Sequence, residues 1–326
     1  MTNKIIGIIA GEPNSIASEI IFKAWKKREK YRHCHFFIIG SFSILEKQKN
    51  TLGFKNLRLK KITENFKKKD LMENKLSVLN INFQQNSSFS KISKKSKPYI
   101  FKCFDLCIKL IKSKKIIGLI NCPVSKEHLF DKNSKGVTEY LSKKYSTPGK
   151  EVMLIYNKNL AVSPITTHIR LSDVVRSLNK KIIIEKIETI NRFYKKVLKK
   201  SPKIAALGIN PHNYSGDKKK SDENNIILPA IKSLKKKKIN VIGPVSPDTS
   251  FMIYKKYKID IIVGMYHDQV LTPFKSIFGF NAVNITLGLP FIRISPDHGV
   301  GSNIAGKKIA NPNSLIESIK FFNNLK

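Results

Sequence analysis

The sequence predicts an α/β protein with a mixed, largely parallel sheet. Short apolar runs rich in Ile and Val alternate with longer amphipathic stretches, which is typical of strands that alternate with helices. Several of the runs are continuously apolar, as expected for strands covered on both faces. At 326 residues the chain is long enough for two domains or one large one, because about 150 residues per domain is usual.

The apolar runs and amphipathic stretches define the expected elements in chain order. Strands are expected at residues 5–10, 36–39, 116–120, 152–156, 160–166, 204–209, 259–265, 282–286 and 291–295. Helices are expected at residues 15–27, 99–112, 171–179, 183–199, 225–235 and 314–323. Residues 61–98 are rich in Lys, Ser and Asn, with one apolar patch at 76–81. This segment is interpreted as a loop-rich excursion or a hairpin.

The charge of the chain is strongly positive. Sixty-one Lys and Arg residues against 23 Asp and Glu give a net charge of +38, which admits a nucleic-acid-binding protein as one hypothesis. Only seven of the basic residues are Arg, the residue that base and phosphate recognition favours. The lysines are also scattered over the whole chain. We therefore expect weak, unspecific attraction of anions and no specific nucleic-acid partner.

The sequence also predicts a cytoplasmic protein. No apolar run reaches the ~18 residues that a membrane-spanning helix needs, so no membrane partner is expected. The N-terminal apolar run meets Gly11-Glu12-Pro13 before a signal-peptide core could be completed. The four cysteines lack Cys-x-x-Cys spacing, and buried thiols in a reducing compartment are expected for them; they are Cys34, Cys103, Cys107 and Cys122.

Three of the seven histidines share one local context. His168, His212 and His267 each follow the carboxyl end of an expected strand. Ligands of open α/β sheets gather at this end of the strands, and three neutral imidazoles would leave open positions on a divalent metal. Capping of a strand end by each histidine is the alternative, and the sequence alone leaves both open.

Three loops that follow expected strands carry a Pro with polar neighbours, at residues 11–13, 121–126 and 295–299. They could receive anions or a cofactor, although Pro is also common in ordinary turns. The sequence contains neither a G-x-G-x-x-G fingerprint nor a P-loop. A dinucleotide, if bound, is therefore not held by the ordinary Rossmann fingerprint.

Motifs over nearly the whole chain resemble the 4-hydroxythreonine-4-phosphate dehydrogenase family of pyridoxal phosphate biosynthesis. The matching stretches are GEP (11–13), PVSK (123–126), TTH (166–168), NPH (210–212), PDTSF (247–251), MYHDQ (265–269), VNITLGLPFIRISPDHG (283–299) and IAGKKIANP (304–312). The tail HGVGSNIAGKKIANP (298–312) is also similar to the adenine-side NAD loop of the isocitrate and isopropylmalate dehydrogenases. That superfamily binds NAD without the Rossmann glycines.

The resemblance implies metal-dependent oxidation of 4-phosphooxy-L-threonine with NAD or NADP. The product, 2-amino-3-oxo-4-phosphooxybutanoate, decarboxylates to 3-amino-2-oxopropyl phosphate. One divalent metal per site (Zn²⁺, Mg²⁺ or Co²⁺) would bind to the three histidines above, with Asp248 and Asp268 as candidates for orienting them and capping as their alternative. The implied substrate ligands are Thr138, Lys275, Asn284 and Arg293. The implied cofactor ligands are His298, Gly299, Ala305, Gly306 and Asn311.

The resemblance further implies two α/β/α domains, with the active site in the cleft between them at a homodimer interface. Histidines from both subunits would meet there. By the logic of the superfamily, residues 1–135 and 270–326 form the first, cofactor-side domain. Residues 136–269 then form the second domain, which carries the metal ligands and the dimer contacts.

Val137 departs from the family pattern. The family has Gly-His-Thr-Glu where this chain has Gly136-Val137-Thr138-Glu139, and the His touches the substrate. Val137 occupies that substrate-binding position but has no hydrogen-bonding group. This favours an alternative, a sibling dehydrogenase that acts on another 4-phosphorylated hydroxy acid such as 4-phospho-threonate or -erythronate.

Overall fold

The computed structural model describes residues 4–130, 136–144, 150–213 and 221–325. Contacts within the chain divide it into two compact units, unit 1 (Met1–Leu141 and Pro290–Leu325) and unit 2 (Ser142–Leu289). Residues 270–289, expected in the first domain, pack within unit 2. They do so because β11 (Val283–Leu287) pairs with β6 (Val152–Tyr156), and because helix α10 (His267–Phe278) contacts β7 (Ala161–Pro164) and β10 (Ile261–Gly264).

The described strands of unit 1 form a parallel sheet in the order β3-β4-β2-β1-β5-β12. Their bounds are β1 (Ile5–Ile9), β2 (His35–Gly40), β3 (Leu59–Ile62), β4 (Leu76–Asn80), β5 (Gly118–Asn121) and β12 (Ile292–Pro296). All five residues of β1 are buried, as expected for a strand covered on both faces.

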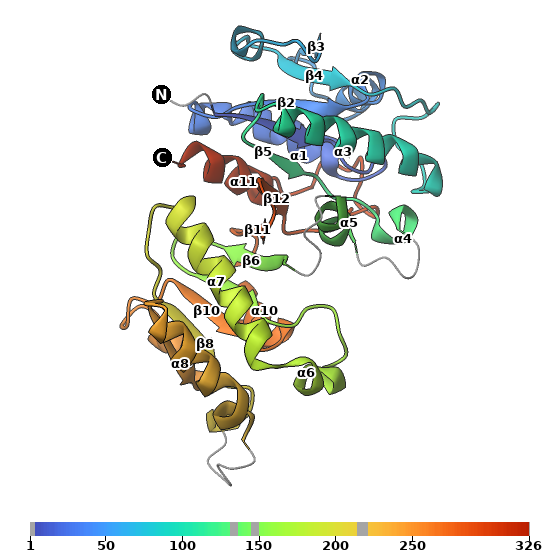
Figure 1. Cartoon of the computed structure of the whole chain (residues 1–326). Helices are drawn as coiled ribbons and strands as arrows, with labels where there is room; N and C mark the ends of the chain where they lie inside the picture. Colours follow the sequence, from blue (N-terminus) through green and yellow to red (C-terminus); the bar gives the residue numbers. More distant parts are fainter. Residues whose placement is uncertain (1–3, 131–135, 145–149, 214–220, 326) are drawn as a thin grey trace. The chain divides into compact units, whose positions relative to one another are not determined.

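Helices cover both faces of the unit 1 sheet (Figure 1). A Cβ at Gly7 would lie 3.2 Å from the sulfur of Cys107 in α3 (Lys97–Lys112). A Cβ at Gly118 would lie 2.7 Å from the ring of Phe322 in α11 (Asn313–Asn323). Gly118 pairs with Ile6 and so faces away from Gly7, which puts α3 and α11 on opposite faces. Helix α1 (Ala17–Lys26) contacts both α11 and α2 (Phe42–Thr51).

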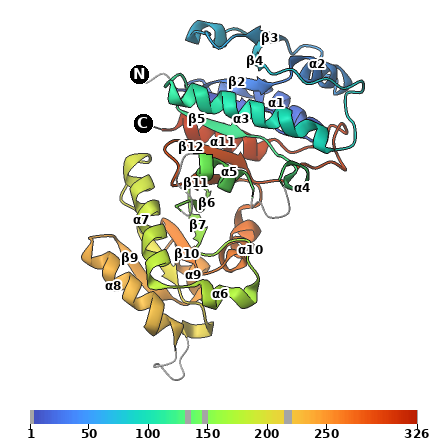
Figure 2. The same ribbon diagram turned by 45° about the vertical axis from the view of Figure 1, so that its right-hand side comes forward.

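The described strands of unit 2 form a mixed sheet in the order β11-β6-β7-β10-β8-β9, with β8 (Ile204–Leu207) and β9 (Val241–Val245) at one end. β6 runs antiparallel to both of its neighbours, and the other pairs are parallel. Helices α7 (Lys180–Lys196) and α8 (Leu228–Lys236) lie on one side of this sheet and α10 on the other (Figure 2). The predicted mixed, largely parallel α/β fold is confirmed.

Several shorter helices complete the described structure. They are α4 (Lys126–Leu129), α5 (Val137–Lys144), α6 (Leu171–Ser177), α9 (Pro247–Ile253), the 3-10 turns Arg28–Tyr31, Lys68–Leu71, Lys94–Ser96 and Pro211–Asn213, and the π-helical turn Glu223–Ile227. Within the described ranges, no helix combines the length and the apolar character needed to cross a bilayer.

All nine predicted strands and all six predicted helices form, within a few residues of the expected bounds. The hairpin interpretation of residues 61–98 is wrong. The apolar patch forms β4, which pairs in parallel with both β3 and β2, so the connections are crossovers. Helix α10 was missed as well, because Pro273 lies inside it and Pro usually ends a helix. All four cysteines are buried and free, as predicted.

Candidate active site

The three candidate metal ligands follow three adjacent parallel strands of unit 2. β10 lies between β7 and β8 and is parallel to both, so the carboxyl ends of the three strands share one edge. His168, His212 and His267 follow β7, β8 and β10 in turn. The ring centroids of His168 and His267 are 5.6 Å apart.

Two of these histidines adopt the left-handed backbone conformation, which is costly for residues other than glycine. The φ angles of His168 and His212 are +52° and +50°. The left-handed conformation costs an L-residue roughly 1–2 kcal/mol, and such residues cluster at functional sites. Lys114 and Lys238 also have positive φ, but each follows the end of a helix, where this conformation is a common terminator. The two histidines instead follow strands.

Carboxylates accompany two of the three imidazoles. Nδ1 of His267 lies 2.6 Å from Oδ1 of Asp268, and Nδ1 of His212 lies 3.8 Å from Oδ2 of Asp248. The pKa of Asp248 is lowered, first by the hydrogen bond from Ser246 and then by the charge of His212. A carboxylate beside a histidine fixes its tautomer and orientation, as in many metal sites.

The donor chemistry therefore fits a divalent metal, but the described residues of one chain do not assemble a complete site. No three His, Cys, Asp or Glu side chains gather closely enough there to hold an ion. The predicted coordination of a metal by the three histidines, with ligands from two subunits, stays a prediction.

Backbone and side-chain hydrogen bonds tie the ends of these three strands together. Oγ1 of Thr166 donates to the carbonyl oxygen of Met265 over 2.8 Å, which joins β7 to β10. The side chain of Gln269 accepts from the Met265 N–H over 2.7 Å and donates to the Gly208 carbonyl over 2.8 Å, which joins β10 to β8. No sequence pattern indicates this role of Gln269, although the residue lies in the MYHDQ stretch.

Glu223 anchors the turn that precedes His212. Its Oε1 accepts from the backbone N–H groups of Ile209 and Asn210, over 2.9 and 2.8 Å. Its Oε2 accepts from the Ser221 hydroxyl over 2.7 Å. A carboxylate with three such donors is well satisfied although it is buried. No sequence pattern indicates this role of Glu223 either.

In unit 1, two of the predicted substrate ligands are in contact. Nη1 of Arg293, on β12, donates to Oγ1 of Thr138, on α5, over 3.3 Å. Nε of Arg293 donates to Oδ1 of Asn121, at the end of β5, over 2.7 Å. Arg293 is only 5% exposed, and burial lowers its pKa to about 10, an effect that Glu139 opposes. Such a buried guanidinium suits recognition of a carboxylate or phosphate.

The other predicted substrate residues have varied surroundings. Val137, the first residue of α5, is 5% exposed, so its apolar side chain is packed in unit 1. In unit 2, Lys275 lies exposed on α10, and Asn284 lies half-buried on β11 opposite Ile155 of β6.

The predicted cofactor ligands lie on one loop of unit 1, residues 298–312, called the cofactor loop below. Nδ1 of His298 donates to the carbonyl of Gly299 over 3.2 Å, and burial lowers the pKa of this imidazole. Nε2 of the neutral ring then carries a lone pair. It is buried and has no hydrogen-bond partner in the described part of the chain. A ligand with an N–H or O–H group, such as a nicotinamide dinucleotide, would satisfy it.

The remaining cofactor-loop residues are accessible to different degrees. Ala305 is half-buried, while Gly299 and Asn311 are exposed. Gly306 has φ +80°, and a Cβ there would lie 3.2 Å from the ring of Phe89. Glycine is therefore the residue that fits this position.

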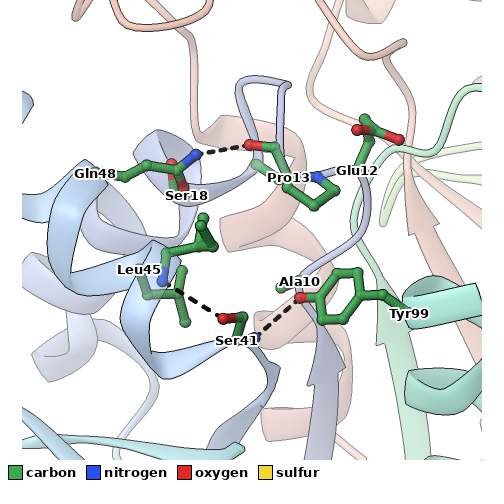
Figure 3. Close-up of a pocket in the computed structure, with 10 residues that line it drawn as sticks. Ala10, Glu12, Pro13, Ser18, Ser41, Leu45, Gln48 and Tyr99 are labelled. Atoms are coloured by element: carbon green, nitrogen blue, oxygen red, sulfur yellow. Dashed lines mark hydrogen bonds between the residues drawn. The ribbon is translucent and has the colours of Figure 1, made fainter. Parts of the chain in front are cut away.

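A small pocket lies beside the Gly11-Glu12-Pro13 turn of unit 1, as Figure 3 shows. Glu12 lines it and is 1% exposed, accepting from the Ser96 hydroxyl over 2.7 Å and from the Asn14 N–H over 3.3 Å. Burial nevertheless raises the pKa of Glu12. Across the pocket, the side chain of Gln48 donates to the Pro13 carbonyl over 2.6 Å, and the Tyr99 hydroxyl accepts from the Ser41 N–H over 3.0 Å.

Three histidines follow adjacent strands of unit 2, and a buried arginine lies on the sheet of unit 1. Polar groups at the strand ends of an α/β fold are typical of an enzyme. The sequence family described as "Pyridoxal phosphate biosynthetic protein PdxA" matches residues 32–322. A protein of Sulfurihydrogenibium sp. named 4-hydroxythreonine-4-phosphate dehydrogenase is 40% identical over 97% of this chain and 96% of its own length. The chain belongs to the PdxA family, and the predicted enzyme class, an oxidoreductase, is confirmed.

Two further similarities bear on the fold and the substrate. The crystal structure of 4-hydroxythreonine-4-phosphate dehydrogenase from Klebsiella pneumoniae is similar to this one over 98% of both chains. The two are 28% identical in sequence, and the TM-score is 0.83. An Oceanobacillus iheyensis protein provisionally named a D-threonate 4-phosphate dehydrogenase is 32% identical over 97% of this chain and 96% of its own length.

Proposed function

We propose that this protein oxidises the C3 hydroxyl of 4-phosphooxy-L-threonine with NAD⁺ or NADP⁺. The observation that carries the proposal is the placement of three histidines after three adjacent parallel strands, in a chain of the PdxA family. The reaction releases a proton and NAD(P)H and leaves a ketone at C3. That ketone can accept the electron pair left by loss of CO₂, which gives 3-amino-2-oxopropyl phosphate.

The chain's own residues would bind and orient the reactants. His168, His212 and His267 would hold one divalent cation (Zn²⁺, Mg²⁺ or Co²⁺), with Asp248 and Asp268 fixing the orientation of two of the rings. When bound, the cation would polarise the C3 hydroxyl, and the nicotinamide would accept the hydride.

The substrate's negative groups call for cationic and polar partners. Arg293 and Lys275 would bind its phosphate and carboxylate through charge-assisted hydrogen bonds. Thr138, already in contact with Arg293, and Asn284 would complete the set. His298, Gly299, Ala305, Gly306 and Asn311 would contact the dinucleotide, with the unpartnered Nε2 of His298 as an acceptor.

The test is reduction of NAD⁺ and of NADP⁺ by the purified chain with 4-phosphooxy-L-threonine, before and after chelator treatment. We expect absorbance at 340 nm to rise, to stop when the metal is removed and to resume when Zn²⁺, Mg²⁺ or Co²⁺ is returned. No reduction of either nucleotide with any of the three metals would contradict the proposal. We also propose that the protein is cytoplasmic and forms a homodimer; sedimentation of the purified chain would test the dimer.

The second candidate is a dehydrogenase of 4-phospho-D-threonate or 4-phospho-erythronate. The buried, apolar Val137 favours it, since a histidine that contacts the substrate is absent at that position. The Oceanobacillus iheyensis relative supports it as well. Comparing kcat/KM for the three phosphorylated acids would separate the candidates.

A further inference from the structure

Helix α1 contacts the cofactor loop near both of the loop's ends. At the start, the Ile16 N–H, next to the first helical residue, donates to the carbonyl of Val300 over 3.0 Å. At the far end, the Ala310 N–H donates to Oε1 of Glu19, in the first turn of the helix, over 2.8 Å. The second contact joins residues 291 positions apart in sequence and is buried.

Lys23, one helical turn after Glu19, completes the second contact. Its Nζ lies 2.6 Å from Oε1 of Glu19. It also donates to the backbone carbonyls of Ala310 and Lys308, over 2.7 and 2.9 Å. Glu19 and Lys23 together therefore hold both the N–H and the C=O of Ala310.

The cofactor loop depends on such contacts because residues 301–312 form no helix or strand that could hold them in place. Glu19 is fully buried, so its carboxylate has no compensation from water and relies on Lys23 and on the loop backbone. Side chains that hold a binding loop in its bound conformation raise affinity, since the ligand does not have to order the loop.

We propose that Glu19 and Lys23 are positioning residues that fix the far end of the cofactor loop for nicotinamide dinucleotide binding. This inference depends on the proposed function, since it takes residues 298–312 as the cofactor loop. Neither residue touches the dinucleotide in this proposal; both act through the backbone of Lys308 and Ala310. Their loss should weaken binding of the oxidised and the reduced dinucleotide alike, and should leave the affinity for the phosphorylated acid unchanged.

The experiment measures the Kd of NADH and of NADPH for the purified full chain, by nucleotide fluorescence and by calorimetry. The variants are Lys23→Met, Glu19→Gln and the double variant. Lys49→Met is the matched control, because Lys49, whose side chain is 13% exposed, forms an ion pair with Glu46 (2.7 Å) within α2 of the same unit. Thermal unfolding establishes that each variant is folded. The 26% exposed Lys23 tolerates substitution better than the buried Glu19, so Lys23→Met decides the matter if Glu19→Gln does not fold.

For the nucleotide that the wild type prefers, we expect Kd to rise about tenfold in Lys23→Met and in Glu19→Gln, the order of magnitude for a lost hydrogen bond to a charged group. The double variant should be little worse than either single one, because the two residues act as one unit. KM for the nucleotide should rise while kcat and KM for the acid stay near wild type. Lys49→Met should bind within twofold of wild type.

Two results overturn this inference, and they are distinguishable. A wild-type chain that binds neither NADH nor NADPH contradicts the proposed function, and this inference is lost with it. A wild-type chain that binds one of them, while the folded Lys23→Met variant has the same Kd, contradicts only the positioning role of the Glu19–Lys23 pair.

Discussion

Nε of Arg293 donates a 2.7 Å hydrogen bond to Oδ1 of Asn121, and both residues are buried. They lie on adjacent strands of the unit 1 sheet: Arg293 of β12 pairs with Leu119 of β5, two residues before Asn121. The amide oxygen fixes one edge of the guanidinium without neutralising its charge. We expect the charge of Arg293 to contribute to the binding of an anionic group of the substrate.

The first prediction concerns this pair. Arg293→Ala should raise KM for the phosphorylated acid at least tenfold, because a charge-assisted contact contributes about 1.5–3 kcal/mol. Asn121→Ala should raise KM less, since it leaves the charge and removes only its orientation. Steady-state kinetics measures both, and Arg192→Ala in α7 of unit 2 serves as the control. An unchanged KM in Arg293→Ala would place the anion-binding group elsewhere.

The second prediction concerns Val137. Val137→His introduces a hydrogen-bonding side chain at the position where the family has one, at the start of α5. The new imidazole should bind 4-phosphooxy-L-threonine better than 4-phospho-D-threonate. In Val137→His, the ratio of kcat/KM for the first acid to kcat/KM for the second should therefore rise about 10-fold, a typical contribution of one buried polar contact. Val137→Asn controls for polarity alone. An unchanged ratio of the two kcat/KM values would show that position 137 does not select the substrate.

The third prediction concerns the metal. His212→Ala should abolish metal-stimulated turnover and lower the affinity for Co²⁺ or Zn²⁺ measured by calorimetry. The side chain is 77% exposed, so the free energy of unfolding without metal should change little. His33→Ala, on the surface of unit 1, is the matched control. Full metal-dependent activity in His212→Ala would remove this residue from the proposed site.

The fourth prediction uses the raised pKa of Glu12. The folded chain keeps the Glu12 proton to a higher pH than the unfolded chain, in which the pKa is near the ordinary 4.5. Stability from the protonated side chain is thus present below pH 4.5 and declines as the pH rises above it. The free energy of unfolding of Glu12→Gln, minus that of wild type, should therefore increase as the pH rises above 4.5.

Urea unfolding at a series of pH values would measure that difference for Glu12→Gln. The same substitution at the surface residue Glu185 controls for the loss of one carboxylate from the chain. A difference between Glu12→Gln and wild type that is constant with pH, or that decreases as the pH rises, would contradict the prediction.

The spacing of the apolar residues was enough to predict nine strands, six helices and the α/β class. Strands covered on both faces appear as continuous apolar runs, and helices with one buried face appear as amphipathic stretches. It was not enough for β4, whose parallel pairing depends on which strand lies beside it, or for α10, whose interior Pro273 contradicts the local preference. The packing of Val270, Leu271 and Phe274 into the core of unit 2 outweighs that preference.

The family motifs identified the candidate ligands. The three histidines share one edge of the sheet because each follows the carboxyl end of a parallel strand. The residues that hold those ligands in place were not predictable in the same way. Asn121 contacts a partner 172 positions away, Glu19 one that is 291 away, and Gln269 one that is 61 away. A hydrogen bond between such residues leaves no periodic signal in the sequence, because only the folded sheet brings them together. Apolar runs and motifs thus predict most of the elements and the chemistry at their ends. Which buried side chains keep that chemistry in position depends on the folded sheet.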